Sequence, residues 1–139
     1  MCFSSQMDLA LAEAEKAAAV GEVPVGAVIV DPKGTVIASA ANRTRRDSDP
    51  TAHAEILAIR KAAKFLGNDR LVGCTMYVTL EPCAMCAGAL SHARVARIIY
   101  GAPDPKSGGT DHGARVFEHS QTHHRPEVLG GISEAACST

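Results

Sequence analysis

The first third of the chain changes from a helical to an extended pattern of hydrophobic positions. Between residues 7 and 18, apolar side chains recur every three or four positions with charged residues between them, which predicts an amphipathic helix ended by Gly21. The apolar segments at 25–30 and 36–41 are each typical of a strand. Because a turn sequence at 31–34 lies between them, the two strands are expected to form a hairpin.

Strands and helices alternate in the middle of the chain. A helix is predicted from about Ala52 to Gly67, with Thr51 as its N-cap. A strand at 75–80 leads into a short helix whose first position is Pro82, and a strand at 97–100 follows, so these two strands should be parallel. The expected apolar stripe of the longer helix consists of Ala52, Ile56, Ile59, Ala63 and Leu66.

Two loops and a short C-terminal region complete the predicted organisation. The segment at 42–50 is polar, and the glycine-containing segment at 101–113 is too long to be featureless in a compact domain, so it is expected to cover a site. A short strand is predicted at 127–129, and a helix capped by Ser133 follows it. At 139 residues, the chain is expected to form a single α/β domain over residues 1–139.

Composition and charge exclude several classes of protein. The chain is 46% apolar and 21% charged, as soluble globular proteins are, and it has no apolar run of membrane-spanning length. Its N-terminus resembles neither a signal peptide nor a transit sequence. Five cysteines are an odd count, which indicates a reducing, cytoplasmic environment rather than a disulfide framework. Because the net charge is −1, any nucleic-acid contact must come from a local patch.

Candidate metal ligands occur in two short motifs. Cys83 and Cys86 are three positions apart, which places both side chains on one face of a helix, in the first turns where a thiolate is favoured. A zinc site needs about four ligands, or three ligands and a water. His53 offers a third ligand, and Glu55 follows two residues later. His-x-Glu followed by Pro-Cys-x-x-Cys is the signature of zinc-dependent nucleobase deaminases.

The residue types predict a division of labour at this site. His53, Cys83 and Cys86 are expected to hold one Zn²⁺ and to leave one coordination position open for a water. Binding to zinc lowers the pKa of such a water to about 7. Glu55 is then free to take the proton and deliver it to the ring nitrogen and the leaving amine. Residues two apart on a regular helix point about 200° apart, so His53 must lie at the helix mouth. The alternatives are a closed structural zinc site or ordinary buried cysteines, but no second Cys-x-x-Cys is present.

Three other features have both a functional and a simpler interpretation. Gly26, inside a strand, indicates a close approach either of a ligand or of a tightly packed helix. The arginines of the 42–50 loop are compatible with phosphate contact or with local ion pairs. No second metal site is expected at the histidines near the C-terminus, because no cysteine or carboxylate cluster accompanies them; these are His119, His123 and His124.

Together these residues resemble the bacterial tRNA-specific adenosine deaminase family, within the wider cytidine deaminase-like fold. The resemblance extends from about residue 7 to residue 137. It rests on EVPVGA at 22–27, ANR at 41–43, DPTAHAE at 49–55, YVTLEPCAMCAG at 77–88 and GAPDPKSG at 101–108.

The resemblance implies a three-layer α/β/α fold with a five-stranded mixed sheet, a homodimer and one zinc ion per subunit. It implies hydrolysis of adenosine to inosine at the wobble position of an arginine tRNA, with the anticodon stem-loop as partner. By the same analogy, Asn42 would hydrogen-bond the flipped base and Asp104 would contact the ribose of a flanking nucleotide. His124 or Arg125 would lie near the RNA backbone.

The chain departs from that family in its C-terminal region, which lacks the longer helix with paired aromatic and basic residues. It contains no Trp and few aromatic residues on which bases could stack. Two alternatives therefore remain open. One is a deaminase of a free nucleobase or nucleoside, of guanine or cytosine type, with the same zinc mechanism. The other is a non-catalytic, zinc-stabilised RNA-binding or scaffold protein.

Overall fold

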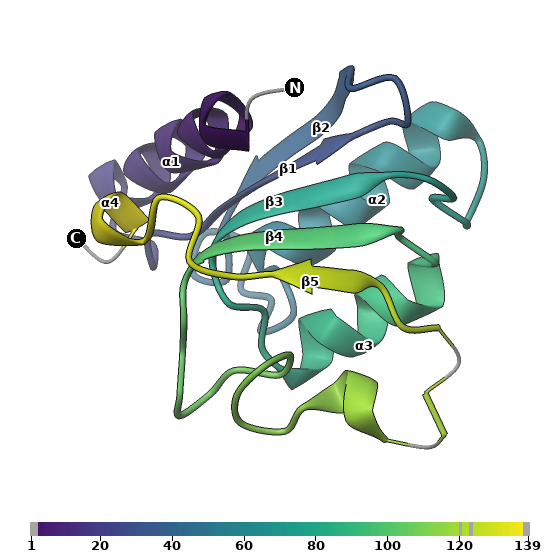
Figure 1. Ribbon diagram of the computed structural model, residues 1–139. Coiled ribbons are helices and arrows are strands. Elements are labelled where there is room, and N and C mark those ends of the chain that lie inside the picture. Colours follow the sequence, from purple (N-terminus) through teal and green to yellow (C-terminus); the bar gives the residue numbers. More distant parts are fainter. Residues whose placement is uncertain (1–2, 120, 123, 138–139) are drawn as a thin grey trace.

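The computed structural model describes residues 3–119, 121–122 and 124–137. In that part of the chain, five strands form one sheet in the order β2-β1-β3-β4-β5 (Figure 1). The strands are β1 Gly26–Val30, β2 Val36–Ala41, β3 Thr75–Leu80, β4 Arg97–Ala102 and β5 Glu127–Leu129. The helices are α1 Phe3–Ala19, α2 Ala54–Leu66, α3 Ala84–Ala93 and α4 Glu134–Cys137, with a single 3₁₀ turn, η1, at Val116–Glu118.

The sheet is mixed, as expected. β1 pairs antiparallel with β2 and with β3, whereas β4 pairs parallel with β3 and with β5. The predicted hairpin of β1 and β2 and the parallel pairing of β3 and β4 are therefore confirmed. β4 continues to Ala102, two residues beyond its predicted end, and α4 begins directly after Ser133.

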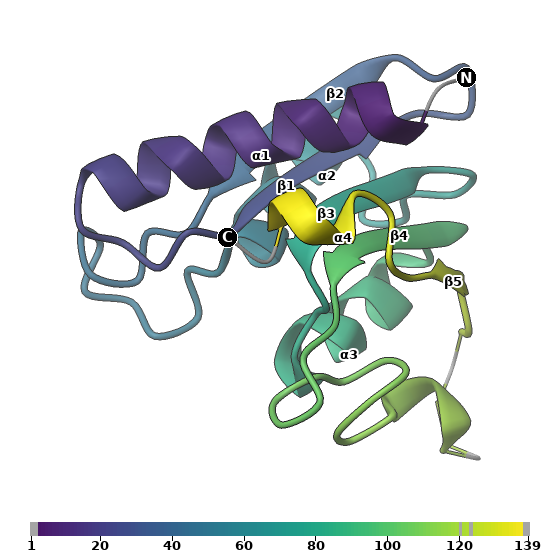
Figure 2. The ribbon, with the colours of Figure 1, turned by 60° about the vertical axis from the view of Figure 1, so that its left-hand side comes forward.

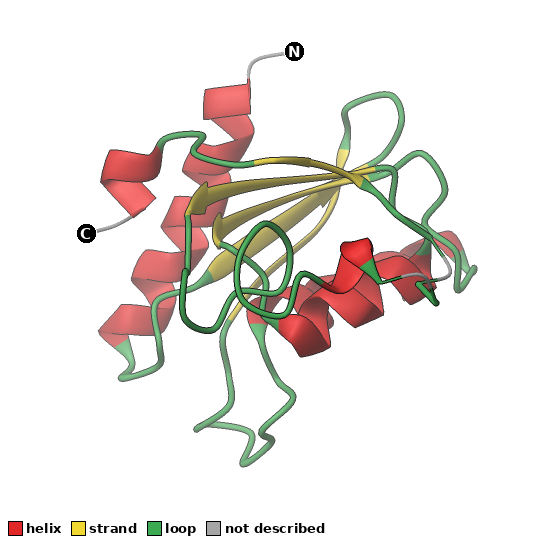
Figure 3. Ribbon diagram, turned by 60° about the horizontal axis from the view of Figure 1, so that its bottom comes forward, coloured by secondary structure: helices red, strands yellow, loops and turns green. Residues whose placement is uncertain are grey.

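Helices cover both faces of the sheet and make three layers (Figure 2 and Figure 3). On one face, Met7 and Ala10 of α1 pack with Val28 and Tyr77. The other face packs against buried alanines and Leu90 of α2 and α3. The three-layer α/β/α prediction is confirmed. None of the described helices has both the length and the apolar character needed to cross a membrane.

The predicted apolar stripe of α2 is wrong in part, because Ile59 and Ala63 pack against the core but Leu66 is exposed. The fully buried apolar residues of this helix are Ala54, Ala58 and Ala62, while the larger Ile56 and Ile59 are only half-buried. Three methyl groups facing the sheet let α2 lie close to it, and the bulkier side chains fill its flanks. The distance between α2 and the sheet is thus determined by alanine.

Candidate active site

The candidate site is a pocket of about 250 Å³ beyond the carboxyl ends of β3 and β4. Ligands commonly bind at this edge of an α/β sheet. The lining combines the predicted metal ligands with residues from several loops. It consists of Val23, Val25, Asn42, Thr44, His53, Glu55, Leu80, Glu81, Cys83, Asp104 and Ser107.

His53 stands at the mouth of α2, as the sequence required. It is the N-cap, with an extended backbone (φ −72°, ψ 153°), and its carbonyl oxygen accepts a hydrogen bond from Leu57 N at 3.0 Å. Glu55 lies in the first turn of the helix. The prediction of Thr51 as N-cap is wrong, because its hydroxyl instead donates to the Asp49 carboxylate at 2.7 Å. The irregular backbone at His53 lets both functional side chains reach the same pocket.

The cysteines occupy an equivalent position on α3. Cys83 is the N-cap, again with extended backbone (φ −72°, ψ 176°), and Cys86 lies in the first turn. Pro82 therefore precedes the N-cap, and its predicted place as the first helical residue is wrong. Both parts of the candidate metal centre thus begin at a helix N-terminus.

The donor atoms fit a zinc ion. His53 Nδ1 lies 3.7 Å from Cys83 Sγ and 3.5 Å from Cys86 Sγ. Donors that share one tetrahedral zinc, with Zn–S of about 2.3 Å and Zn–N of about 2.0 Å, stand about 3.6 Å apart. Among the described residues, these three form the one group of His, Cys, Asp or Glu side chains compact enough to hold a metal. The predicted ligand set is therefore brought together.

The protein tunes the acidity of the groups around this centre. A hydrogen bond with the Cys86 thiol lowers the pKa of Cys83 to about 5, and the same bond raises the pKa of Cys86. Cys83 is therefore a thiolate at neutral pH, the form that binds metals. Glu55 is only 4% exposed, and this burial raises the pKa of its carboxyl group to about 7. A carboxyl group with a pKa near 7 both accepts and returns protons under physiological conditions.

The walls of the pocket carry Asn42 and Asp104. Asn42 follows β2 and is buried; its main chain pairs with Val25, and no other described residue hydrogen-bonds to its side-chain amide. Asp104 follows β4, and its carboxylate accepts hydrogen bonds from the main-chain N–H groups of Lys106 and Ser107. Both side chains thus line the pocket, and their contact with a substrate stays a prediction.

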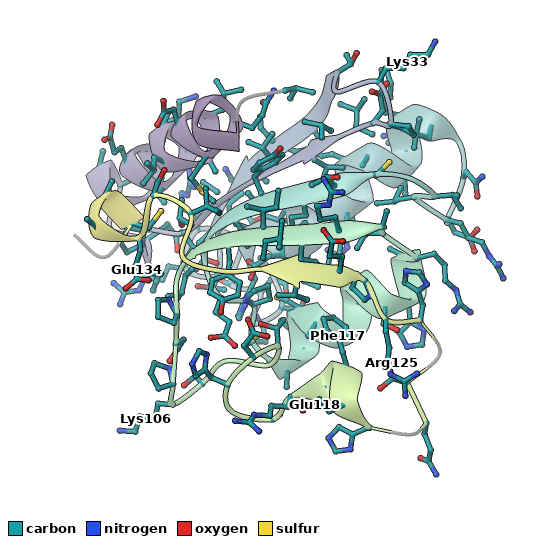
Figure 4. All side chains as sticks on the ribbon, viewed as in Figure 1. Lys33, Lys106, Phe117, Glu118, Arg125 and Glu134 are labelled. Carbon is teal, nitrogen blue, oxygen red and sulfur yellow. The ribbon has the colours of Figure 1, made fainter. Side chains whose placement is uncertain are left out.

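Gly26, His124 and Arg125 are not among the lining residues. A side chain at Gly26 would place its Cβ 1.9 Å from the Ala10 carbonyl oxygen of α1, so the tight-packing interpretation explains this glycine. His124 Nε2 is 2.7 Å from the Val95 carbonyl oxygen, near the start of β4. Arg125 lies close to the start of β5 (Figure 4), whereas the pocket lies beyond the carboxyl ends of β3 and β4.

Arg125 donates to the carbonyl oxygens of Phe117 and His119. An RNA-backbone contact by His124 or Arg125 stays a prediction. His119 is also engaged, through Nε2 and the Ala114 carbonyl oxygen, and His123 lies outside the described residues.

The arginines of the 42–50 loop contact other protein groups, and one of them forms a local ion pair. Arg43 pairs with Asp47 at 3.1 Å, and Arg46 pairs with Glu22 at 3.3 Å. Arg45 donates to the Gly21 carbonyl oxygen. The simpler of the two interpretations of this loop therefore accounts for the contacts these side chains make.

Sequence reasoning missed several wall residues, and Glu81 is the most informative of them. Burial of its side chain opposes ionisation, but hydrogen bonds from Asp104, His112 and Thr110 outweigh that effect and lower its pKa. The only local signal was an acidic residue between an apolar strand and Pro82. Nothing in that pattern identified its partners.

Fold and site together define a zinc-dependent deaminase. Residues 3–102 match the family model of the cytidine and deoxycytidylate deaminase zinc-binding region. Within that class, the chain belongs to the tRNA-specific adenosine deaminase family. It is 53% identical over 129 residues to the tRNA-specific adenosine deaminase of Agrobacterium fabrum, over 93% of this chain and 84% of that protein. The resemblance noted from the sequence is confirmed.

Solved structures agree with this assignment. One, from a study of A-to-I editing by tRNA deaminases at the wobble position of transfer RNA, has a TM-score of 0.95 and 50% identity, with 97% of each chain covered. The guanine deaminase of Bacillus subtilis has a TM-score of 0.71 and 41% identity, over 74% of this chain and 66% of that one. The same fold therefore occurs in proteins named for different bases.

Proposed function

We propose that this protein converts adenosine to inosine at the wobble position of a tRNA anticodon. The observation that carries the proposal is the placement of Glu55 beside the His53, Cys83 and Cys86 donor set, at the floor of a pocket walled by Asn42. Typical ligand pockets hold about 300–1,000 Å³, so a pocket of about 250 Å³ is suited to one base rather than to a larger ligand.

The reaction replaces the exocyclic amine of adenine with oxygen. When bound, zinc supplies the Lewis acidity that makes hydroxide available for attack near neutral pH. Glu55 takes one proton from the attacking water and passes it to the purine ring nitrogen. It then takes the second proton, from the hydroxyl group now on the attacked carbon, and passes it to the departing amine. One C–O bond forms, one C–N bond breaks, and ammonia leaves. Because Glu55 is buried, its protons are exchanged with substrate rather than with bulk solvent.

The walls supply recognition. The Asn42 amide offers both a donor and an acceptor to the polar edge of a purine. The Asp104 carboxylate is an acceptor that suits a ribose hydroxyl. An anticodon loop presents bases that are already unstacked, so extruding one of them into a pocket costs little. We further propose that the protein works in the cytoplasm as a homodimer with one zinc ion per subunit.

The test is a deamination assay on several substrates in parallel. Purified protein is incubated with an arginine anticodon stem-loop carrying adenosine at the wobble position, and separately with free guanine, cytosine and adenosine. Inosine is measured in digested RNA, and ammonia is measured in the other reactions. A stem-loop with guanosine at the wobble position is the matched RNA control, and Glu55→Ala protein controls for contaminating deaminases.

Inosine in the adenosine stem-loop alone is the expected outcome. Ammonia from free guanine with untouched RNA would overturn the tRNA assignment in favour of nucleobase deamination, the alternative supported by the guanine deaminase structure. No turnover on any substrate, in protein that holds one zinc ion per chain, would favour the non-catalytic RNA-binding alternative. Light scattering of the same sample tests the homodimer.

A further inference from the structure

Glu81 is an enclosed carboxylate between β3 and the Cys83 motif. Its side chain has no solvent exposure. One carboxylate oxygen accepts hydrogen bonds from Asp104 N at 3.0 Å and from the His112 ring Nδ1 at 2.7 Å. The other accepts from Thr110 N and its hydroxyl, at 3.3 and 3.0 Å, and from His112 N at 2.9 Å. All of these donors belong to the single segment 104–112.

That segment forms one wall of the pocket. Asp104 and Ser107 line it, and Lys106 lies at the outer turn of the same loop (Figure 4). Main-chain contacts also connect the segment to the metal motif: Gly108 forms a bridge with Cys83, and Gly109 N donates to the Pro82 carbonyl oxygen at 2.7 Å. The wall is therefore attached to the chain that carries two of the zinc donors.

Burying a carboxylate is costly unless its oxygens are well paired. Among the described residues, all the hydrogen bonds to the Glu81 carboxylate come from the loop that contains the wall. The loop in turn gains a fixed point in a region without regular structure. We propose that Glu81 is a positioning residue that holds Asp104 and Ser107 in place for substrate binding; this inference rests on the proposed function of the pocket. Glu81 itself acts through Asp104 rather than on the reacting atoms.

The principal variant is Glu81→Gln. Glutamine keeps the shape of the side chain, but its NH₂ group cannot accept the hydrogen bonds that one carboxylate oxygen now receives. Because hydrogen bonds to a charged group are the strong ones, KM for the anticodon stem-loop is expected to rise about tenfold, with kcat within about twofold of the unchanged protein. Zinc content, measured by atomic absorption, stays the same.

A matched control comes from the same part of the molecule. Glu118 of η1 has a side chain that is 64% exposed, and its one ion pair among the described residues is with Arg115 at 3.5 Å (Figure 4). Glu118→Gln makes the same chemical change at an exposed site, and we expect KM to stay unchanged. A KM increase in both variants would overturn the proposal, because a general loss of negative charge would then explain it.

A double-mutant cycle separates positioning from a merely structural role. If Glu81 acts through Asp104, adding Glu81→Gln to Asp104→Ala raises KM by much less than tenfold. Fully additive effects would overturn the proposal. Should Glu81→Gln fail to fold, His112→Ala removes the ring donor only, and a two- to threefold rise in KM with full zinc is expected.

Hydrogen exchange tests the inference independently of activity. Amides of segment 104–112 are expected to exchange faster in Glu81→Gln, while those of β1 and α2 keep their protection. If the unchanged protein edits no RNA, the proposed function fails, and faster exchange still supports the anchoring of the loop. Unchanged exchange of these amides in Glu81→Gln, whether or not zinc is lost, would overturn the role proposed for Glu81.

Discussion

The floor and the walls of the pocket are held in different ways. On the floor, His53 and Cys83 are the N-caps of two helices, and Glu55 and Cys86 lie in the first turns that follow. On the walls, Asn42 and Asp104 belong to irregular segments that leave the ends of strands. Regular secondary structure thus positions the residues proposed for the chemistry, whereas loops position the residues proposed for recognition.

Each wall depends on a buried acidic residue. Glu81 holds the segment with Asp104. On the opposite side, the enclosed side chain of Glu22 accepts from Arg45 N at 3.1 Å, Arg46 N at 2.8 Å and the Arg46 side chain. Loops without a hydrogen-bond ladder of their own thus gain fixed points from carboxylates.

The largest expected effect follows from removing the proton carrier on the floor. Glu55→Gln keeps the size of the side chain but cannot take up a proton, so kcat on the stem-loop is expected to fall by about 10³-fold or more. Single-turnover assays measure this fall directly. Zinc content and the far-ultraviolet circular dichroism spectrum should match those of the unchanged protein.

Cys86→Ala is the contrasting floor variant, because it removes a metal donor and leaves Glu55 intact. It is expected to purify with clearly less zinc, and zinc analysis distinguishes the two causes of inactivity. If Glu55→Gln retained normal turnover, or if Cys86→Ala kept stoichiometric zinc, the corresponding role on the floor would be wrong.

A smaller effect is expected on the wall. Asn42→Ala removes a purine partner without touching the metal donors, so kcat/KM on the stem-loop should fall by roughly ten- to a hundredfold while zinc stays bound. Asn42→Asp is the matched variant, since it keeps the size of the side chain and replaces its NH₂ donor with a charged carboxylate oxygen. An Asn42→Ala protein with full kcat/KM would show that the wall contributes no recognition, and the contrast with the floor would be lost.

The smallest effect on catalysis is expected at Gly26, which lies outside the pocket. Gly26→Ala pushes a methyl group toward the Ala10 carbonyl oxygen, 1.9 Å away before relaxation, and should lower the free energy of unfolding by about 1–3 kcal/mol. Urea denaturation measures the loss, and kcat/KM per folded molecule should not change.

Gly88→Ala provides a control for the Gly26 variant, since an added Cβ in α3 has nothing within 4 Å. It should leave stability unchanged or raise it slightly, because alanine favours helix over glycine. A Gly26 variant of normal stability with impaired kcat/KM would instead place the backbone at residue 26 in the substrate site.

The sequence predicted the floor almost completely and the walls only in part. Metal ligation requires particular residue types at short spacings, so His53, Cys83 and Cys86 were recognisable without any knowledge of the fold. Their exact helix positions were not, because Thr51 and Pro82 have the composition of helix starts but tertiary contacts begin the helices two residues later. Strand assignments succeeded because buried strands have continuous apolar runs.

The wall residues depended on contacts that no local pattern encodes. Asp104 was expected only through family resemblance, and Asn42 through that resemblance and its place in a loop that leads into His53. Glu81 meets partners 23 to 31 positions away, in a loop whose course depends on β4 and on the metal motif. Gly26 left two interpretations open until the position of α1 was known. A glycine inside a strand indicates that something lies close to the backbone, but the sequence does not say whether this is a ligand or a helix.

The alanines beneath α2 impose a limit on how this protein can change. Ala54, Ala58 and Ala62 are fully buried, so any larger side chain there must lift the helix from the sheet. His53 and Glu55 are carried by the start of α2, whereas Cys83 and Cys86 are carried by α3. Such a lift would therefore lengthen the 3.5 and 3.7 Å distances from His53 Nδ1 to the two Sγ atoms. Three methyl groups thus set the spacing of the catalytic centre. Although these alanines touch no substrate, we expect them to tolerate as few substitutions as the metal ligands themselves.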